Sequence, residues 1–323
     1  MANTGSDIVL SPEKIAYLHQ HINAWYMKNA RELPWRAPDR SSWAVMVSEF
    51  MLQQTPVKRV LPVWEAWLKR WPQPAALAAE PSAEAVRAWG RLGYPRRALR
   101  LHAAATAILD RHQGQVPKSY QELLELPGVG TYTAAAISAF AFGQRSTVID
   151  TNIRRVFARA FLGQALPAKS LTAAESRLAQ DLLPQSQEES VTWNAATMEL
   201  GALICTAKNP ACFRCPVQQA CLWLQEGRPP ASYQPRGQAW AGTDRQLRGA
   251  MLAVLRQNRQ ALPAEVLLRG GQQDLLPDHI SPASISSIKE LQKLGSSPEQ
   301  LERCYRSLLK DGLAQEAEGW VSL

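Results

Sequence analysis

Apolar residues along most of this chain recur at helical spacing rather than in alternation. Two stripes show this most clearly: Ile15, Leu18, Ile22 and Trp25, and Val60, Trp64, Trp67 and Leu68. No strand-like alternation of apolar and polar positions appears before residue 310. The pattern predicts a helical fold for about the first 225 residues. Thr55 followed by Pro56 is typical of an N-cap and a first helical position, so we expect a helix to begin there.

A stretch rich in proline and glycine, residues 227–242, interrupts the helical pattern and predicts a linker. We therefore expect one domain over residues 1–226 and a smaller domain over residues 243–323. In the smaller domain the pattern predicts helices at Leu247–Leu255 and Pro298–Leu309, followed by a short hairpin near the end of the chain. Helices followed by a hairpin resemble a winged-helix unit.

The composition limits the classes of function. The chain has 36 Lys and Arg residues against 28 Asp and Glu, a net charge of +8 and a pI near 9.4. This balance suits a polyanionic partner such as nucleic acid, although a merely basic enzyme would share it. The chain shows no signal-peptide pattern and no run of about 18 apolar residues, so we expect a cytoplasmic protein, nucleoid-associated if bacterial, with no membrane partner.

Four of the five cysteines fall within one short segment. Cys205, Cys212, Cys215 and Cys221 leave six, two and five residues between them. Four thiolates held by short loops bind either a tetrahedral zinc ion or a [4Fe–4S] cluster, and the spacing alone does not separate the two. We expect Cys304, the fifth cysteine, to be an inert core thiol.

A glycine-containing turn, Leu126-Pro-Gly-Val-Gly, leads directly into an alanine-rich helix. Gly128 and Gly130 would let backbone N–H groups approach a DNA phosphate, although a plain helical turn also uses glycine. Together with the cysteine spacing, this turn resembles the helix-hairpin-helix superfamily of endonuclease III and MutY DNA glycosylases. The resemblance implies an all-α, two-lobed core with a [4Fe–4S] cluster on the four cysteines, and with Lys208 and Arg214 placed to meet phosphates.

Two carboxylates suit the chemistry of base removal. Taken alone, Asp150 is most simply an N-cap with Asn152 in the first helical turn. Glu49 lies among apolar residues of the segment 42–56, so it is either a buried general acid or a residue on a solvated face. The resemblance implies that Glu49 protonates the leaving base, that Asp150 stabilises the oxocarbenium-like sugar, and that Asn152 holds Asp150 or the attacking water.

Other segments resemble the MutY branch more than the endonuclease III branch. Tyr132 stands where bifunctional enzymes carry the lysine that forms a Schiff base, which implies hydrolysis without lyase activity. The resemblance also implies the remaining substrate and DNA contacts. These are Leu33, Arg36 and Glu199 in the base pocket, Tyr94 beside the base opposite the target, and Gln54 in the vacated stack, with Gln53 next to it.

The resemblance covers about residues 12–225. It implies a monomeric, monofunctional adenine DNA glycosylase that acts on adenine mispaired with 8-oxoguanine or guanine in double-stranded DNA. A thymine glycosylase for T·G mismatches and a non-catalytic iron–sulfur DNA-binding protein are the alternatives. Many MutY proteins end in a MutT-like domain that binds 8-oxoguanine, and the roughly 80 residues after the linker are too short and too poor in strands to form one. Recognition of that base therefore stays open.

Overall fold

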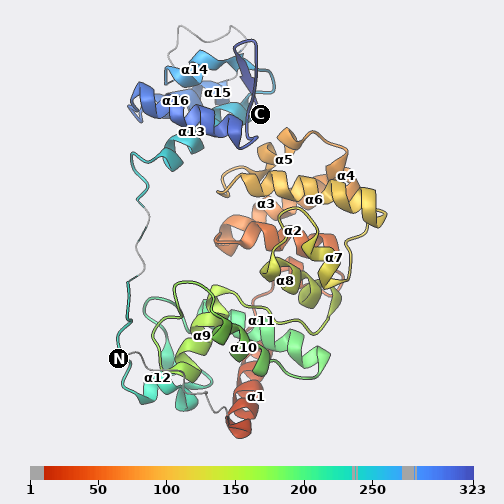
Figure 1. Ribbon diagram of the computed structural model, residues 1–323, viewed down its shortest axis with the longest axis vertical. Coiled ribbons are helices and arrows are strands. Elements are labelled where there is room, and N and C mark those ends of the chain that lie inside the picture. The colour runs from red at the N-terminus through yellow and green to blue at the C-terminus, as the bar shows by residue number, and fades with distance from the viewer. Residues whose placement is uncertain (1–10, 235–236, 238, 271–279, 281) are drawn as a thin grey trace. The chain divides into compact units, whose positions relative to one another are not determined.

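The computed structural model describes residues 11–323 except 235–236, 238, 271–279 and 281, and within them the protein is mostly helical, as the apolar pattern predicts (Figure 1). Up to the end of the cysteine segment the elements are α1 Pro12–Asn29, η1 Pro34–Arg36, α2 Ser42–Leu52, α3 Val57–Arg70, α4 Pro74–Ala78, α5 Ser82–Trp89, α6 Arg96–His112, α7 Tyr120–Leu124, α8 Thr131–Phe142, α9 Thr151–Leu162, α10 Ala173–Asp181, α11 Gln187–Leu203, η2 Cys212–Arg214, η3 Gln218–Ala220 and α12 Leu222–Gln225. The later elements are α13 Asp244–Gln257, β1 Leu262–Pro263, α14 Ala264–Leu268, α15 Pro282–Gln292, α16 Pro298–Lys310, β2 Gln315–Ala317 and β3 Trp320–Ser322.

The chain forms two compact units whose segments alternate along the sequence. The first unit consists of Met1–Met46, Lys118–Leu124 and Val129–Pro235. The second unit consists of Val47–Pro117, Glu125–Gly128 and Arg236–Leu323. Each unit therefore has to be understood from its own core.

The core of the first unit packs around α8, α9 and α11, with α1 against α11. All residues of α8 from 133 to 139 are buried, which is expected of a helix that is apolar on every side. Leu18 and Ile22, from the first predicted stripe, are fully buried on α1. Helix α1 begins where Ser11 accepts a hydrogen bond from the N–H of Lys14, with Pro12 in the first turn.

The helical core of the second unit contains a cluster of tryptophans. Trp67 packs edge-to-face on Trp71 at 4.7 Å and on Trp89 at 5.8 Å between ring centroids. Val60 and Trp67, from the second predicted stripe, are buried on α3. The predicted start of this helix was one residue early.

Helix α3 begins at Val57 with Pro56 as its N-cap, and Thr55 does not cap it. The hydroxyl of Thr55 instead donates to the carbonyl oxygens of Gln53 and Leu92, each at 3.3 Å. A side chain that is engaged by a neighbouring loop is not available to the N–H groups of the following helix.

The C-terminal part of the second unit runs from α13 to β3 and includes the two helices and the hairpin that the pattern predicted. Strands β2 and β3 pair antiparallel, with Glu316 opposite Val321. The turn between them contains Glu318 and Gly319, and both of these residues have positive φ. The two-residue strand β1 pairs with the other edge of β3, giving the order β1-β3-β2. Neither β1 nor α14 was predicted, because such short elements give no periodic signal.

The segment predicted as a linker separates α12 from α13. Wherever the structure describes residues 227–242, they form neither helix nor strand. No helix in the described part of the chain has the length and apolar character that crossing a membrane would need.

Candidate functional site

Asp150 is the N-cap of α9, as its position in the sequence predicted. Its backbone is extended, with φ −94° and ψ 177°, and its Oδ1 accepts a hydrogen bond of 2.6 Å from the N–H of Ile153. Asn152 donates from Nδ2 to Asp150 Oδ2 at 2.8 Å. Burial raises the pKa of Asp150, and these hydrogen bonds to the ionised form offset only part of the rise.

A chain of hydrogen bonds continues from Asp150 through Asn152 to Arg155. Arg155 donates from Nη2 to Asn152 Oδ1 at 2.8 Å and to the carbonyl oxygen of Gly201 at 2.7 Å. Its Nε donates to the carbonyl oxygen of Cys205 at 2.7 Å. The orientation of Asn152, and through it that of Asp150, is therefore fixed by a nearly buried guanidinium that is also bonded to the cysteine segment.

Gly201 allows α11 to lie directly against α9. A Cβ atom at this position would meet Asn152 Cβ at 2.7 Å and the carbonyl oxygen of Asn152 at 2.9 Å. A side chain of any size at residue 201 would therefore displace Asn152. Gly201 was not among the predicted site residues, although a glycine inside an otherwise helical segment is a signal of close packing.

Glu199 is fully buried on α11 and is surrounded by arginine donors. Arg31 donates from Nε and Nη2 to the two carboxylate oxygens, each at 2.7 Å, and from its backbone N–H at 3.0 Å. Arg36 donates from Nη2 at 3.0 Å. Burial alone raises the pKa of Glu199, but the hydrogen bonds from the two arginines outweigh burial and lower this pKa to about 2.

The segment 31–36 carries the other residues predicted for the base pocket. Leu33 and Trp35 are buried, and Arg36 Cζ lies 5.8 Å from the centre of the Tyr26 ring. Among the described residues, nothing accepts a hydrogen bond from the buried Nη1 of Arg36. Arg31 was missed by the sequence reasoning, because its partner Glu199 is 168 residues away in the chain.

Glu49 belongs to the second unit and lies on α2. It is only 6% exposed, and its neighbours Ser48 and Phe50 are also buried. The alternative that Glu49 occupies a solvated face is therefore excluded.

The glycines of the predicted hairpin have different roles. Gly128 has φ +79°, and a Cβ atom there would meet Arg100 Cβ at 2.6 Å, so both the conformation and the space require glycine. Gly130 is the N-cap of α8 and has nothing within 4 Å of a Cβ position, which leaves open space at a helix N-terminus. Tyr132 lies in the first turn of α8 and packs partly against the core of the first unit.

Two loops of the second unit carry the predicted stacking residues, and both are strained. Gln54 has φ +56° and Tyr94 has φ +46°, a region that costs residues other than glycine about 1–3 kcal/mol each. Both side chains are exposed. The guanidinium of Arg97 lies 4.6 Å from the centre of the Tyr94 ring, and its Nη1 donates to the carbonyl oxygen of Gln53.

The four clustered cysteines are not disulfide-bonded. Among the described residues, no three Cys, His, Asp or Glu side chains converge as a metal-binding group. The cysteines are nevertheless near neighbours: burial raises the pKa of Cys215 to about 12, and the charges of Cys205, Cys212 and Cys221 add to the rise. Burial also raises the pKa of Cys221. Cys215 and Cys221 are therefore expected to lose their protons only together with a bound cation.

Arginine side chains that face the cysteine segment give a second, independent indication of what the cysteines bind. Arg159 is 4% exposed and donates from Nη1 to Cys205 Sγ at 3.3 Å and to the carbonyl oxygen of Thr206 at 2.8 Å. Its guanidinium also lies 4.7 Å from the centre of the Trp223 ring. Among the described residues, neither Arg155 nor Arg159 forms a salt bridge, and a buried cation needs a compensating anion. Four thiolates around an iron–sulfur cluster carry such a negative charge, so the residues present fit that group.

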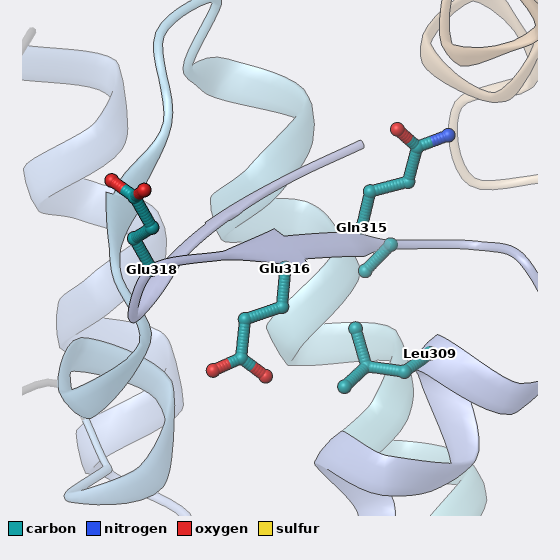
Figure 2. A pocket seen from close by; sticks show the side chains of 5 residues that line it. Leu309, Gln315, Glu316 and Glu318 are labelled. Carbon is teal, nitrogen blue, oxygen red and sulfur yellow. The ribbon is translucent and has the colours of Figure 1, made fainter.

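A surface hollow lies elsewhere, in the C-terminal elements. Its volume is about 570 Å³, and it is lined in the C-terminal elements by Leu309, Ala314, Gln315, Glu316 and Glu318. Figure 2 shows Glu316 and Leu309 on one side of β2, whereas Gln315 points to the other side. None of the predicted site residues lines this hollow, so it does not contribute to the candidate site.

Comparisons with known proteins agree with the geometry. The HhH-GPD superfamily of base excision DNA repair proteins matches residues 47–180. An adenine DNA glycosylase of Mycolicibacterium smegmatis is 43% identical over 301 residues, which cover 93% of this chain and 94% of that protein. An adenine DNA glycosylase of Mycobacterium tuberculosis is 50% identical over 237 residues, which cover 73% of this chain and 77% of that protein.

Solved structures show the same fold. A thermostable thymine-DNA glycosylase aligns with a TM-score of 0.60 at 25% identity, covering 66% of this chain and 98% of that one. Endonuclease III trapped on DNA aligns with a TM-score of 0.59 at 21% identity, covering 68% of this chain and all of that one. With the sequence relatives, these matches show that the chain belongs to the adenine DNA glycosylase (MutY) family of the HhH-GPD superfamily, whose members act in base excision DNA repair.

Proposed function

We propose that the enzyme removes adenine mispaired with 8-oxoguanine or guanine in double-stranded DNA by hydrolysing the N-glycosidic bond. The observation that carries this proposal is the hydrogen-bonded cluster of Arg31, Arg36 and Glu199. Arg36 keeps one buried donor, Nη1, without a partner among the described residues, and adenine offers unprotonated ring nitrogens as acceptors. Glu199 already accepts four hydrogen bonds from the two arginines, so its role is to hold them in place.

Adenine is a poor leaving group, and two carboxyl groups divide the work of expelling it. Glu49, buried among apolar side chains, donates a proton to N7 of the extruded base, so that the bond to C1′ breaks with adenine leaving as a neutral molecule. The sugar then carries the positive charge of an oxocarbenium-like state, which Asp150 stabilises. Water then adds to C1′ and gives one proton to the ionised Glu49, which leaves an abasic site and restores the carboxylic acid.

Asp150 suits its role because no cationic side chain in the described part of the chain bonds to it directly, and the charge of Arg155 reaches it only through space. Its two oxygens accept hydrogen bonds from the N–H of Ile153 and from Asn152, which fix the carboxylate without cancelling its charge. A buried, unpaired carboxylate is stabilised when positive charge develops nearby, so its interaction is stronger in the transition state than in the ground state.

Tyr132 supplies no amine, and we infer that the enzyme cleaves the base without forming a Schiff base. The expected product is an abasic strand that stays intact until alkali is added. Borohydride reduction during turnover tests this, because a covalent enzyme–DNA adduct would show that another amine of the chain acts as nucleophile.

We also propose that Cys205, Cys212, Cys215 and Cys221 bind a [4Fe–4S] cluster. Such a cluster would organise the segment between α11 and α12 and provide negative charge for the arginines that face it. Protein purified without oxygen is expected to be brown and to contain four irons per chain. Stoichiometric zinc with no iron would overturn this assignment.

The elements from α13 to β3 have the order of a winged-helix unit, and we propose that they form one. In this proposal the unit is a domain over residues 243–323, and residues 227–242 join it to a core over residues 1–226. Residues 243–323 hold ten Lys and Arg side chains against ten Asp and Glu, so the net charge of +8 belongs to residues 1–242. Attraction to the phosphate backbone is therefore expected to come from the core, including Lys208 and Arg214 in the cysteine segment.

A panel of duplexes tests the base assignment. Single-turnover reactions with A·8-oxoG, A·G and T·G duplexes, each stopped with alkali, measure base loss as strand cleavage. We expect cleavage of the adenine strand opposite 8-oxoguanine and guanine. Cleavage confined to T·G would overturn the assignment in favour of a mismatch thymine glycosylase, and cleavage of none would favour a non-catalytic DNA-binding protein.

A further inference from the structure

Two separate loops of the second unit present exposed side chains from strained backbone. Gln54 lies between α2 and α3, Tyr94 lies between α5 and α6, and both have positive φ although neither is glycine. Strain of this kind persists only where surrounding contacts hold the backbone in place.

Two polar contacts join the loops. The hydroxyl of Thr55 donates to the carbonyl oxygen of Leu92 at 3.3 Å. Arg97, in the first turn of α6, donates to the carbonyl oxygen of Gln53 and places its guanidinium over the ring of Tyr94 at 4.6 Å. Arg97 thus contacts the residue before Gln54 and the ring of Tyr94 itself.

We propose that Arg97 is a positioning residue that holds Gln54 and Tyr94 as one wedge, so that both enter the base stack together when adenine is extruded. This inference rests on the proposed glycosylase function and on the stacking roles that the family resemblance implies for those two residues. Arg97 then controls base extrusion, and therefore the rate at which adenine reaches the pocket. It does so without contacting the reacting atoms.

The shape of the guanidinium explains why arginine fits here. Its plane can lie over an aromatic ring while an N–H in that plane reaches a carbonyl oxygen at its edge. A lysine ammonium keeps the positive charge but lacks this planar face and fork. If Arg97 only attracted a DNA phosphate, lysine would replace it well. The Arg97→Lys variant therefore distinguishes a positioning role from phosphate attraction.

The experiment measures extrusion directly. A duplex carrying 2-aminopurine opposite 8-oxoguanine is mixed with enzyme in an Asp150→Asn background, and the rise in fluorescence reports unstacking without excision. Arg97→Lys and Arg97→Met are compared with Arg91→Met, which removes a positive charge from the exposed side chain of Arg91 close in sequence to the same loop. Duplex affinity and thermal midpoint are measured on the same samples.

We expect both Arg97 variants to slow the fluorescence rise on the order of tenfold, with duplex affinity and folding unchanged, and Arg91→Met to lower only the salt-dependent affinity. Adding Tyr94→Ala to Arg97→Met should slow extrusion little further, because the two act as a unit. Full rescue by Arg97→Lys, or slowing that is additive with Tyr94→Ala, would overturn the inference. Absence of adenine release by the wild type would instead overturn the proposed function.

Discussion

Glu199 is a fully buried carboxylate of the first unit and Asp150 a partly buried one, and their surroundings differ in charge. Glu199 accepts hydrogen bonds from two arginines, which hold its pKa at about 2 despite burial. Asp150 accepts hydrogen bonds from a backbone N–H and an asparagine, and burial raises its pKa. Glu199 is therefore a permanent anion whose charge the arginines compensate, whereas burial disfavours the anionic form of Asp150.

This difference in charge determines which carboxylate can respond to a developing cation. A charge already compensated by two guanidiniums gains little from a further positive charge, so Glu199 serves as a fixed support for the pocket. Within the residues that the structure describes, no cationic side chain bonds to Asp150, which therefore gains most when the sugar becomes positive. The same residue type thus provides structure at one position and catalysis at the other, because of what surrounds it.

The largest expected effect comes from removing the charge of Asp150. Asp150→Asn should lower the single-turnover rate of adenine excision by on the order of 10³-fold or more, because transition-state stabilisation is lost while the shape is kept. Duplex affinity should be unchanged. Asp181→Asn, at an exposed carboxylate of the same unit, is the matched control and should behave as wild type. Comparable excision by Asp150→Asn would remove Asp150 from the mechanism.

Removing the charge of Glu199 should act first on stability. Glu199→Gln leaves Arg31 and Arg36 close together without their anion, so we expect a loss of about 3–5 kcal/mol in the free energy of unfolding. Excision should fall by about a hundredfold, because the pocket loses its arrangement. Chemical denaturation measures the first effect, with Glu188→Gln on the exposed face of α11 as control. An unchanged unfolding midpoint would contradict the supporting role.

A smaller effect is expected from displacing Asn152 without changing any charge. The methyl group of Gly201→Ala would press on Asn152, and excision should fall about tenfold. Asn152→Ala should give a similar loss. Gly249→Ala is a suitable control, because a Cβ atom at this helical glycine meets nothing within 4 Å. If Gly201→Ala were as active as the control, the position of Asn152 would not matter to the reaction.

The smallest effects should appear in the pH dependence of stability, with opposite signs for the two carboxylates. The pKa of Glu199 is lowered from 4.5 to about 2, so its stabilisation is present above pH 4.5 and is lost as the pH falls toward 2. The pKa of Asp150 is raised above 3.8, so its contribution is present below pH 3.8 and is lost as the pH rises through the folded value.

Denaturation curves of the wild type, Asp150→Asn and Glu199→Gln at a series of acidic pH values measure these two slopes. The advantage of the wild type over Glu199→Gln should shrink as the pH falls. The free energy of unfolding of the wild type, relative to that of Asp150→Asn, should decrease as the pH rises. Slopes of the same sign for both variants would refute the comparison.

The sequence predicted the parts of this site that local patterns encode. The helical stripes, the N-cap at Asp150 and the hairpin glycines follow from spacing over a few residues, and the structure has all three. The partners Arg31, Arg97 and Arg155 were missed. Helical periodicity treats arginine as a surface residue, and it cannot show which guanidinium reaches a carboxylate or carbonyl far away in the chain. The electrostatic contrast between the two carboxylates therefore became visible only in three dimensions.

The most direct test of the central claim is to identify the base that the enzyme releases. Duplexes containing A·8-oxoG and T·G are incubated with wild type and with Asp150→Asn, and free bases are identified by mass spectrometry. We expect free adenine and an unbroken abasic strand from the wild type. Asp150→Asn should bind the duplex equally well and release no adenine. Free thymine without adenine, or equal adenine release by Asp150→Asn, would contradict these expectations.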